Sequence, residues 1–290
     1  MARSYVLRLT GLFILLVFTL FFFVPIVWLL LASTKTDHQL ITENPFAFGS
    51  IGNFAHAWHE MFTFQNDALL SWLENSAVYS FGGVALALIT SIPAGYGLAR
   101  TKFIGRRLLL AITMIVMIIP STALVLPLFL EVNVAHLTDT AWSVILPFAL
   151  FPFGVFLAYI YYASTIPEDL FAAARIDGCT EWQVFRKIAV PLSRPIVALV
   201  AFFAFVANWN NFYLPFVMLP DSTKYPVQVG LEYLLSSTPA FNPANGAADQ
   251  QILRPEVAIA TLVSIAPVLI IFMFAQRTLV SGMLAGATKE

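Results

Sequence analysis

The sequence has little charge. Only 11% of its 290 residues are Asp, Glu, Lys or Arg, whereas 59% are hydrophobic. A soluble globular domain has about 25% charged residues, so this composition excludes an ordinary soluble protein and predicts a membrane protein. The mean hydropathy of +0.82 indicates the same. Basic residues occur singly or in short pairs, which argues against binding to nucleic acid.

Two further absences exclude classes of site. Cys179 is the only cysteine, so the chain can form neither an internal disulfide nor a cysteine-rich metal site. The pattern GxxxxGK, whose backbone amides hold nucleotide phosphates, does not occur. Any ATP that drives this protein must therefore bind to another chain, and we expect no cofactor and no metal on this one.

Long uncharged runs are what the sequence has instead. Six windows of at least twenty residues contain no Asp, Glu, Lys or Arg, and about 20 apolar residues cross a bilayer as a helix. We therefore predict an all-α polytopic membrane protein, a single domain over residues 1–290. Its expected transmembrane helices cover about residues 9–33, 75–99, 108–130, 140–164, 195–219 and 257–277.

The absence of ionisable side chains from the six windows also limits function. Proton- and ion-coupled transporters place such groups at membrane depth, and membrane hydrolases need an acid, a base or a nucleophile. Neither class is favoured. A protein whose energy arrives through contact with a partner fits this pattern better.

Basic residues predict the orientation, because they concentrate on the cytoplasmic side of membrane proteins. With both termini in the cytoplasm, twelve basic residues lie inside and three outside. The inside set is Arg3, Arg8, Arg100, Lys102, Arg106, Arg107, Arg175, Arg186, Lys187, Arg194, Arg277 and Lys289, and the outside set is Lys35, Lys224 and Arg254.

The segment Ile166–Pro195 interrupts the apolar pattern with eight charged residues. Thr165 can cap a helix that begins at Pro167, and Gly178 after Asp177 can end it in the left-handed conformation. Thr180 and Gln183 then form a capping box. A second short helix follows, with Trp182 and Phe185 in its apolar stripe, and Pro191 and Pro195 close it. From these residues alone, either docking to a partner or lying on lipid headgroups would explain the segment.

Several residues in this segment resemble a known family. Ala173-Ala174, Asp177-Gly178, Phe185, Ile188 and Pro191 are similar to the EAA loop of ABC importer permeases. The family has glutamate at position 172, where this chain has Ala172, and Glu168 is a nearby carboxylate that could partly substitute. The resemblance continues in Tyr96, Ala99-Arg100, Phe103 and Gly105, in Asn208–Phe212 with Pro215, and in the tail from Gln276-Arg277 to Lys289, which is similar to the second, six-helix permease subunit of maltose-type importers.

The resemblance implies a type I ABC importer permease fold in the cell membrane of a prokaryote. It implies a heterodimer with a homologous permease, two ATP-binding subunits that hold ATP and Mg, and an extracytoplasmic substrate-binding protein. The loop 165–194 would carry the coupling helix that contacts the ATPase. Its expected contact residues are Glu168, Leu170, Phe171, Ala172, Ala173, Ala174, Asp177 and Gly178.

The fifth window offers candidates for a substrate pathway. Asn208, Asn210 and Asn211 supply amide donors and acceptors, and Trp209 supplies a flat face on which a sugar ring could stack. The same residues could instead be an interfacial tryptophan with asparagines bonded to neighbouring helices. A carbohydrate or related polyol is the expected solute. The alternatives are a stand-alone channel or facilitator for small polar solutes, and a membrane-embedded enzyme using Glu60, Asp67 or Glu74.

Overall fold

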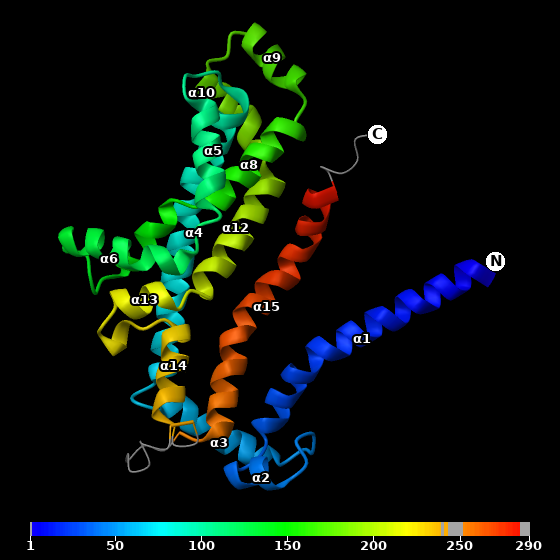
Figure 1. The fold of residues 1–290 in the computed structure, drawn as a ribbon, viewed down its shortest axis with the longest axis vertical. Coiled ribbons are helices and arrows are strands. Elements are labelled where there is room, and N and C mark those ends of the chain that lie inside the picture. Colours follow the sequence, from blue (N-terminus) through cyan, green and yellow to red (C-terminus); the bar gives the residue numbers. More distant parts are fainter. Residues whose placement is uncertain (1, 239–240, 243–251, 285–290) are drawn as a thin grey trace. The chain divides into compact units, whose positions relative to one another are not determined.

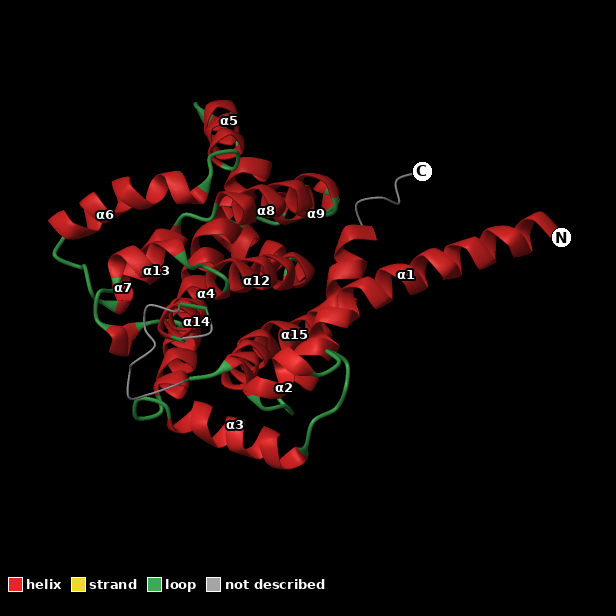
Figure 2. Cartoon of the chain, turned by 60° about the horizontal axis from the view of Figure 1, so that its bottom comes forward, coloured by secondary structure: helices red, strands yellow, loops and turns green. Residues whose placement is uncertain are grey.

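The computed structural model describes residues 2–238, 241–242 and 252–284 (Figure 1). These residues form helices, turns and loops without any β-strand (Figure 2), which confirms the predicted all-α class. The longer helices are α1 (Ala2–Ala32), α3 (Ile51–Thr63), α4 (Ala68–Arg100), α5 (Arg106–Val116), α6 (Val125–Val134), α8 (Pro152–Ser164), α9 (Glu168–Ile176), α12 (Arg194–Trp209), α14 (Val227–Ser237) and α15 (Arg254–Leu284).

Shorter elements join these helices. The α-helical ones are α2 (Asp37–Thr42), α7 (Ala141–Ile145), α10 (Glu181–Val184), α11 (Val190–Leu192) and α13 (Tyr213–Met218). The others are the 3-10 segments η1 (Ser121–Leu124), η2 (Leu146–Ala149) and η4 (Ser222–Lys224), and the π-helical turn η3 (Phe185–Ala189).

The chain forms two compact units. One consists of Met1–Leu70 and Gly230–Ala266, and the other of Ser71–Val229 and Pro267–Glu290. In the second unit α4, α8 and α12 run side by side (Figures 1 and 2). Gly95 lets α4 approach α8 closely, because a β-carbon at Gly95 would lie 2.4 Å from the Ala158 Cβ.

Four continuous segments are long and apolar enough to cross a membrane: Arg8–Ala32, Ala68–Arg100, Ala141–Ser164 and Arg254–Gln276. Two further candidates are bent pairs of helices, so the described residues hold up to six spans. The expected helix over 108–130 is one of these pairs. Its halves, Arg106–Val116 and Ser121–Val134, meet at 104°.

Proline accounts for the break in that third span. Pro120 has an extended ψ of 128°, and proline also disfavours the helical conformation of the residue before it. The fifth expected span, 195–219, is interrupted as well, because α12 ends at Trp209 and α13 begins at Tyr213. A continuous helix would need an amide hydrogen at Pro215 to bond the Asn211 carbonyl, and proline has none.

In the first unit, polar contacts fix the turn after α1. The Lys35 ammonium is buried and donates to the Asn44 carbonyl, while Arg254 at the start of α15 pairs with Asp37 at 2.8 Å. Three aromatic side chains lie in a row on α3, where the Trp58 ring is 5.9 Å from Phe54 and 4.4 Å from Phe62.

In the second unit, a polar clasp joins three segments. Lys224 donates to the Asp139 carboxylate at 2.5 Å and lies 3.5 Å from the Asp221 carboxylate. Its carbonyl accepts a hydrogen bond from the Tyr79 hydroxyl of α4 at 2.9 Å. Asn75, one turn earlier on α4, donates to two further carbonyls of the segment 223–225. These contacts fix the segment 219–226, which contains η4, against α4.

The stability that Asp221 and Lys224 contribute to this clasp depends on pH. Hydrogen bonds from Thr223 lower the pKa of Asp221, and the hydrogen bond to Asp139 raises the pKa of Lys224. The Asp221 contribution is therefore present above its unfolded pKa of about 3.9 and lost as pH falls through the lower folded value. The Lys224 contribution is present below its unfolded pKa of about 10.4 and lost as pH rises through the higher folded value.

We accordingly expect the difference in thermal midpoint between the wild type and Asp221→Asn to stay constant from about pH 5 to pH 9 and to shrink towards pH 3. Thermal unfolding of the detergent-solubilised protein across this range measures it. A difference that changes between pH 5 and pH 9 would contradict this assignment.

Candidate functional site

The charged segment Ile166–Pro195 folds as two short helices joined at Gly178. The first, α9, begins at Glu168 with Glu168 and Asp169 in its first turn, where carboxylates stabilise the positive end of the helix dipole. The predicted cap is wrong, since Thr165 is the C-cap residue of α8 and no side-chain hydrogen bond caps α9. Pro167 is extended, with ψ of 138°, so it precedes the helix and is not its first residue.

The end of α9 is as predicted. Gly178 has φ of +81°, and its amide donates to the Arg175 carbonyl while the Cys179 amide donates to the Ala174 carbonyl. This pair of bonds is a Schellman motif, in which the residue after the cap adopts the left-handed conformation that glycine takes without strain. The Asp177-Gly178 turn therefore reverses the chain within a few residues.

The second helix also begins as predicted. The Thr180 amide donates to the Gln183 side chain at 2.8 Å, and the Gln183 amide donates to the Thr180 hydroxyl at 3.4 Å. The helix ends at Leu192, between Pro191 and Pro195 as predicted, with Pro191 inside its last turn. The π-helical turn Phe185–Ala189, just before Pro191, replaces the usual α-helical hydrogen bonds with bonds between residues five apart. Pro195 lies in the first turn of α12, where proline is well tolerated.

The expected contact residues on α9 divide between two faces. Phe171 and Ala174 are buried, so their side chains are not available to a partner. Ala172 is half-buried. Glu168, Leu170, Ala173, Asp177 and Gly178 are exposed. Two apolar residues outside the expected contact set are also exposed, Ile176 at 85% and Trp182 at 65%.

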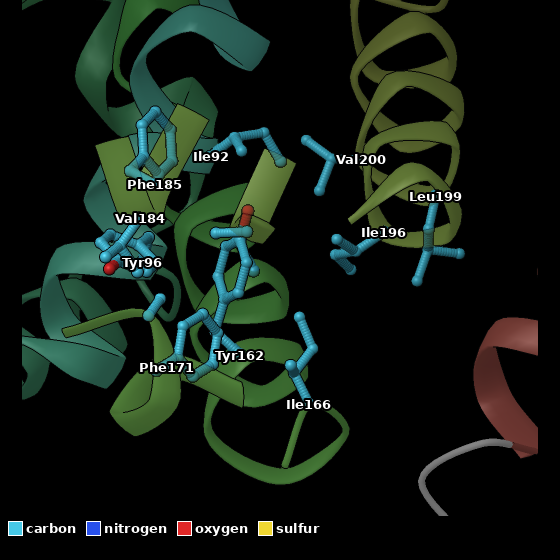
Figure 3. Close-up of a cluster of buried hydrophobic side chains, with 13 residues drawn as sticks. Ile92, Tyr96, Tyr162, Ile166, Phe171, Val184, Phe185, Ile196, Leu199 and Val200 are labelled. Carbon is cyan, nitrogen blue, oxygen red and sulfur yellow. The ribbon is translucent and has the colours of Figure 1, made fainter. Parts of the chain in front are cut away.

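Aromatic packing holds the inner face of α9. The Tyr96 ring of α4 lies 5.5 Å from Tyr162, 6.1 Å from Phe171 and 5.1 Å from Phe185. Figure 3 shows Phe171 and Tyr162 close together in this cluster, with Tyr96 and Val184 beside them. Aromatic pairs at these separations contribute about 0.5–1.5 kcal/mol each beyond the area they bury.

Arg100 completes the attachment of α9 to α4. Its side chain is only 9% exposed. The guanidinium lies 4.7 Å from the centre of the Phe171 ring, donates to the Ile166 carbonyl and pairs with Glu168 at 3.4 Å. One side chain at the end of α4 therefore contacts Ile166, two residues ahead of α9, as well as the first residue of α9 and its buried aromatic. We call Tyr96 and Arg100 together the α4 anchor.

A further pair links the two short helices. Arg175 donates to Glu181 at 2.6 Å, and the Tyr96 hydroxyl donates to the other oxygen of Glu181 at 3.3 Å. Arg175 lies in the last turn of α9 and Glu181 in the first turn of α10. The segment is therefore fixed on α4 at both helices, and a displacement of α9 would be passed to α4 through these contacts.

The candidate pathway residues do not share one surface. Asn208 and Trp209 are buried, and Trp209 stacks on Phe205 at 5.4 Å. Asn210 is exposed and Asn211 half-buried in the break after α12. Asn208 donates to the Ala204 carbonyl at 2.8 Å, and among the described residues its Oδ1 has no hydrogen-bond partner.

Asn208 is packed against Gly83 of α4. A β-carbon at Gly83 would lie 2.3 Å from Asn208 Oδ1, so only glycine allows this approach. We expect Gly83→Ala to lower the free energy of unfolding by about 1–3 kcal/mol. Asn208→Ala in the same chain should restore much of the loss. Thermal unfolding of both single variants and the double variant measures the coupling, and strictly additive losses would contradict it.

Among the side chains that the structure describes (residues 8–238, 241–242 and 252–276), no three His, Cys, Asp or Glu are grouped so that they could hold a metal ion. The polar side chains described above instead serve helix packing and the attachment of α9. Of the functional sites that the sequence suggests, the segment around α9 is the one that combines an exposed face with a buried face packed on α4.

Comparison with known proteins is consistent with this geometry. Residues 91–284 match the family described as binding-protein-dependent transport system inner membrane component. The chain is 32% identical to the arabinooligosaccharides transport system permease protein AraQ of Bacillus subtilis, over 98% of this chain and 96% of that protein. It is 32% identical to the sulfoquinovosyl glycerol transport system permease protein SmoH of Agrobacterium fabrum, over 98% and 93%.

A solved structure has the same fold. A chain of the bacterial ABC transporter involved in the import of the acidic polysaccharide alginate superposes with a TM-score of 0.80 at 23% identity, covering 95% of this chain and 97% of that one. The bent third span and the interrupted fifth span therefore occur within a known type of architecture.

Proposed function

Because the chain belongs to the binding-protein-dependent transport system inner membrane components, the membrane permeases of ABC importers, we propose that it is one of two permease subunits of a carbohydrate importer. The relatives whose names state a solute are mostly permeases for oligosaccharides or disaccharides, which supports the carbohydrate class. The other permease would be homologous to this chain, and an extracytoplasmic binding protein would deliver the solute.

The observation that carries the proposed coupling role is the two-faced geometry of α9. Its inner face is held by Tyr96 and Arg100, and its outer face exposes Glu168, Leu170 and Ala173. We infer that the outer face contacts one of two ATP-binding subunits on the cytoplasmic side. ATP and Mg would be bound there, and movement of α9 would reach α4 through the anchor.

The solute pathway is expected at the end of α12, away from the coupling segment on α9. Of the four residues expected there, Asn210 and Asn211 lie in the non-helical break between α12 and α13, where their amides end α12 by donating to the Val206 and Asn208 carbonyls. Irregular backbone within a membrane protein is tolerated where it lines a cavity or packs on protein. We propose that Asn210 and Asn211 face the pathway, and that Asn208 and Trp209 support the helix behind them.

The test is purification of the chain from its own membrane with whatever accompanies it. We expect a second permease and an ATPase to co-purify, with ATP hydrolysis that rises when a sugar-loaded binding protein is added. If the chain purifies alone and moves solute in vesicles without ATP, it is a facilitator and the proposal fails.

A further inference from the structure

The turn between α4 and α5 forms a basic hollow. Lys102, Arg106 and Arg107 line it together with Phe103, Gly105 and Leu108. Three positive charges therefore lie within six residues. In the part of the chain that the structure describes, none of the three pairs with a carboxylate. Arg106 is held by its hydrogen bond to the Ala99 carbonyl at 3.2 Å, which fixes its guanidinium at the edge of the hollow.

The backbone of the hollow also favours an anion. Gly105 precedes α5 with φ of +91°, and no side chain caps the amides of the first turn. The amino end of an eleven-residue helix carries partial positive charge from such amides. This field adds to that of the three side chains, so the hollow favours a negatively charged group over a neutral one.

The surroundings of the hollow are apolar. Phe103 and Ile104 at the tip of the turn are exposed, and so are the side chains that continue along the outer face of α5, namely Leu108, Leu109, Ile112 and Ile115. The opposite side of α5 packs on α8. An apolar tip beside lysine and arginine is typical of a segment at the membrane interface. The outer face of α5 runs about 10 Å from Leu108 to Ile115, enough to lie along part of an acyl chain.

We propose that this hollow binds the phosphate of an anionic phospholipid, with its acyl chains along the outer face of α5. The cations and the helix end recognise the headgroup, and the exposed leucine and isoleucine side chains contact the chains. An acidic patch of a soluble partner would match the charges but not the apolar tip. The inference depends on the chain lying in a membrane, and it is independent of the coupling role of α9.

The test uses the purified importer in detergent, titrated with phosphatidylglycerol or phosphatidylcholine and examined by native mass spectrometry. Lys102→Gln combined with Arg107→Gln removes two exposed charges and leaves Arg106 in place. Arg186→Gln combined with Lys187→Gln removes the same charge from an exposed surface elsewhere. Each basic residue close to an anionic lipid strengthens its binding. We therefore expect about tenfold weaker retention of phosphatidylglycerol when Lys102 and Arg107 are replaced. Retention should be unchanged when Arg186 and Lys187 are replaced.

Three results would overturn the proposal. Equal loss in the two double variants would show that only total charge matters. Competition by inorganic phosphate at the same concentration as the lipid would show a phosphate site without a lipid. Loss of the ATPase from the Lys102→Gln, Arg107→Gln complex, with lipid retention unchanged, would show that the hollow docks a protein.

Discussion

Replacing Gly178 with valine is expected to reduce ATP-driven uptake by about tenfold or more while the chain still inserts into the membrane. The left-handed conformation at φ of +81° costs an L-residue roughly 1–2 kcal/mol, and more when it is β-branched. A free energy of about 1.4 kcal/mol is a tenfold change in an equilibrium constant. The Schellman turn would open, and the exposed face of α9 would no longer be held in one orientation. Uptake of labelled solute, normalised to the amount of chain in the membrane, measures the effect.

The matched control for this variant is Gly178→Asn. No heavy atom lies within 4 Å of a β-carbon built at Gly178, so size alone is tolerated there, and asparagine adopts the left-handed conformation more readily than valine. Uptake in the asparagine variant should stay within about threefold of the wild type. If valine is as well tolerated as asparagine, the turn is not needed for coupling.

Replacing Arg100 with alanine is expected to have a comparably large effect. The substitution removes the ion pair to Glu168, the bond to the Ile166 carbonyl and the cation over Phe171. A hydrogen bond to a charged group contributes about 1.5–3 kcal/mol when it is buried. We therefore expect α9 to detach in part from α4, and sugar-stimulated ATP hydrolysis to fall about tenfold or more in the assembled importer.

Two further variants separate the role of Arg100 from a general loss of packing. Tyr96→Phe keeps the ring contacts and loses only the 3.3 Å bond to Glu181, so it should change stimulated hydrolysis by less than about threefold. Arg100→Lys keeps the charge but not the planar fork, and should recover only part of the activity. Stimulated hydrolysis at the wild-type level in Arg100→Ala would show that the α4 anchor does not transmit the movement of α9.

Local signals in the sequence predicted the parts of this molecule that depend on local chemistry. The turn at Gly178 follows from the need for a residue free to adopt positive φ, and the start of α10 follows from the Thr180–Gln183 capping box. The uncharged windows identified the apolar helices, because each helix must bury or expose to lipid a long apolar surface. These features depend on residues within a few positions of one another.

Features set by distant contacts could not be predicted from local patterns. Trp182 and Phe185 share the expected apolar stripe, with ring centres 5.6 Å apart, but the stripe does not show that Phe185 is buried against Tyr96 while Trp182 is exposed. Arg100 contacts Ile166 and Glu168, which lie 66 and 68 positions later in the chain. An uncharged window also cannot show a bend, so the 104° turn at Pro120 could not be predicted from hydropathy alone.

The expected residues of α9 illustrate the same limit. The sequence pattern places Phe171 and Ala174 among the contact residues, but helical spacing shows only that they share a face with each other. The packing of Tyr96 and Tyr162 on Phe171 determines that this face is the inner one. Leu170 and Ala173 thereby become the outward positions, together with Ile176 at the end of the helix.

Chemical crosslinking in the intact importer tests the contact between α9 and the ATPase most directly. Cys179 is first replaced with serine, which leaves no other cysteine in the chain. A cysteine is then placed at Ala173 on the exposed face of α9 or, as a control, at Ile118 in the exposed break of the third span. With a short crosslinker that reacts with a thiol at one end and an amine at the other, Ala173→Cys should crosslink to the ATPase subunit and Ile118→Cys should not. No crosslink from Ala173→Cys, or an equal yield from both positions, would contradict the proposed coupling site.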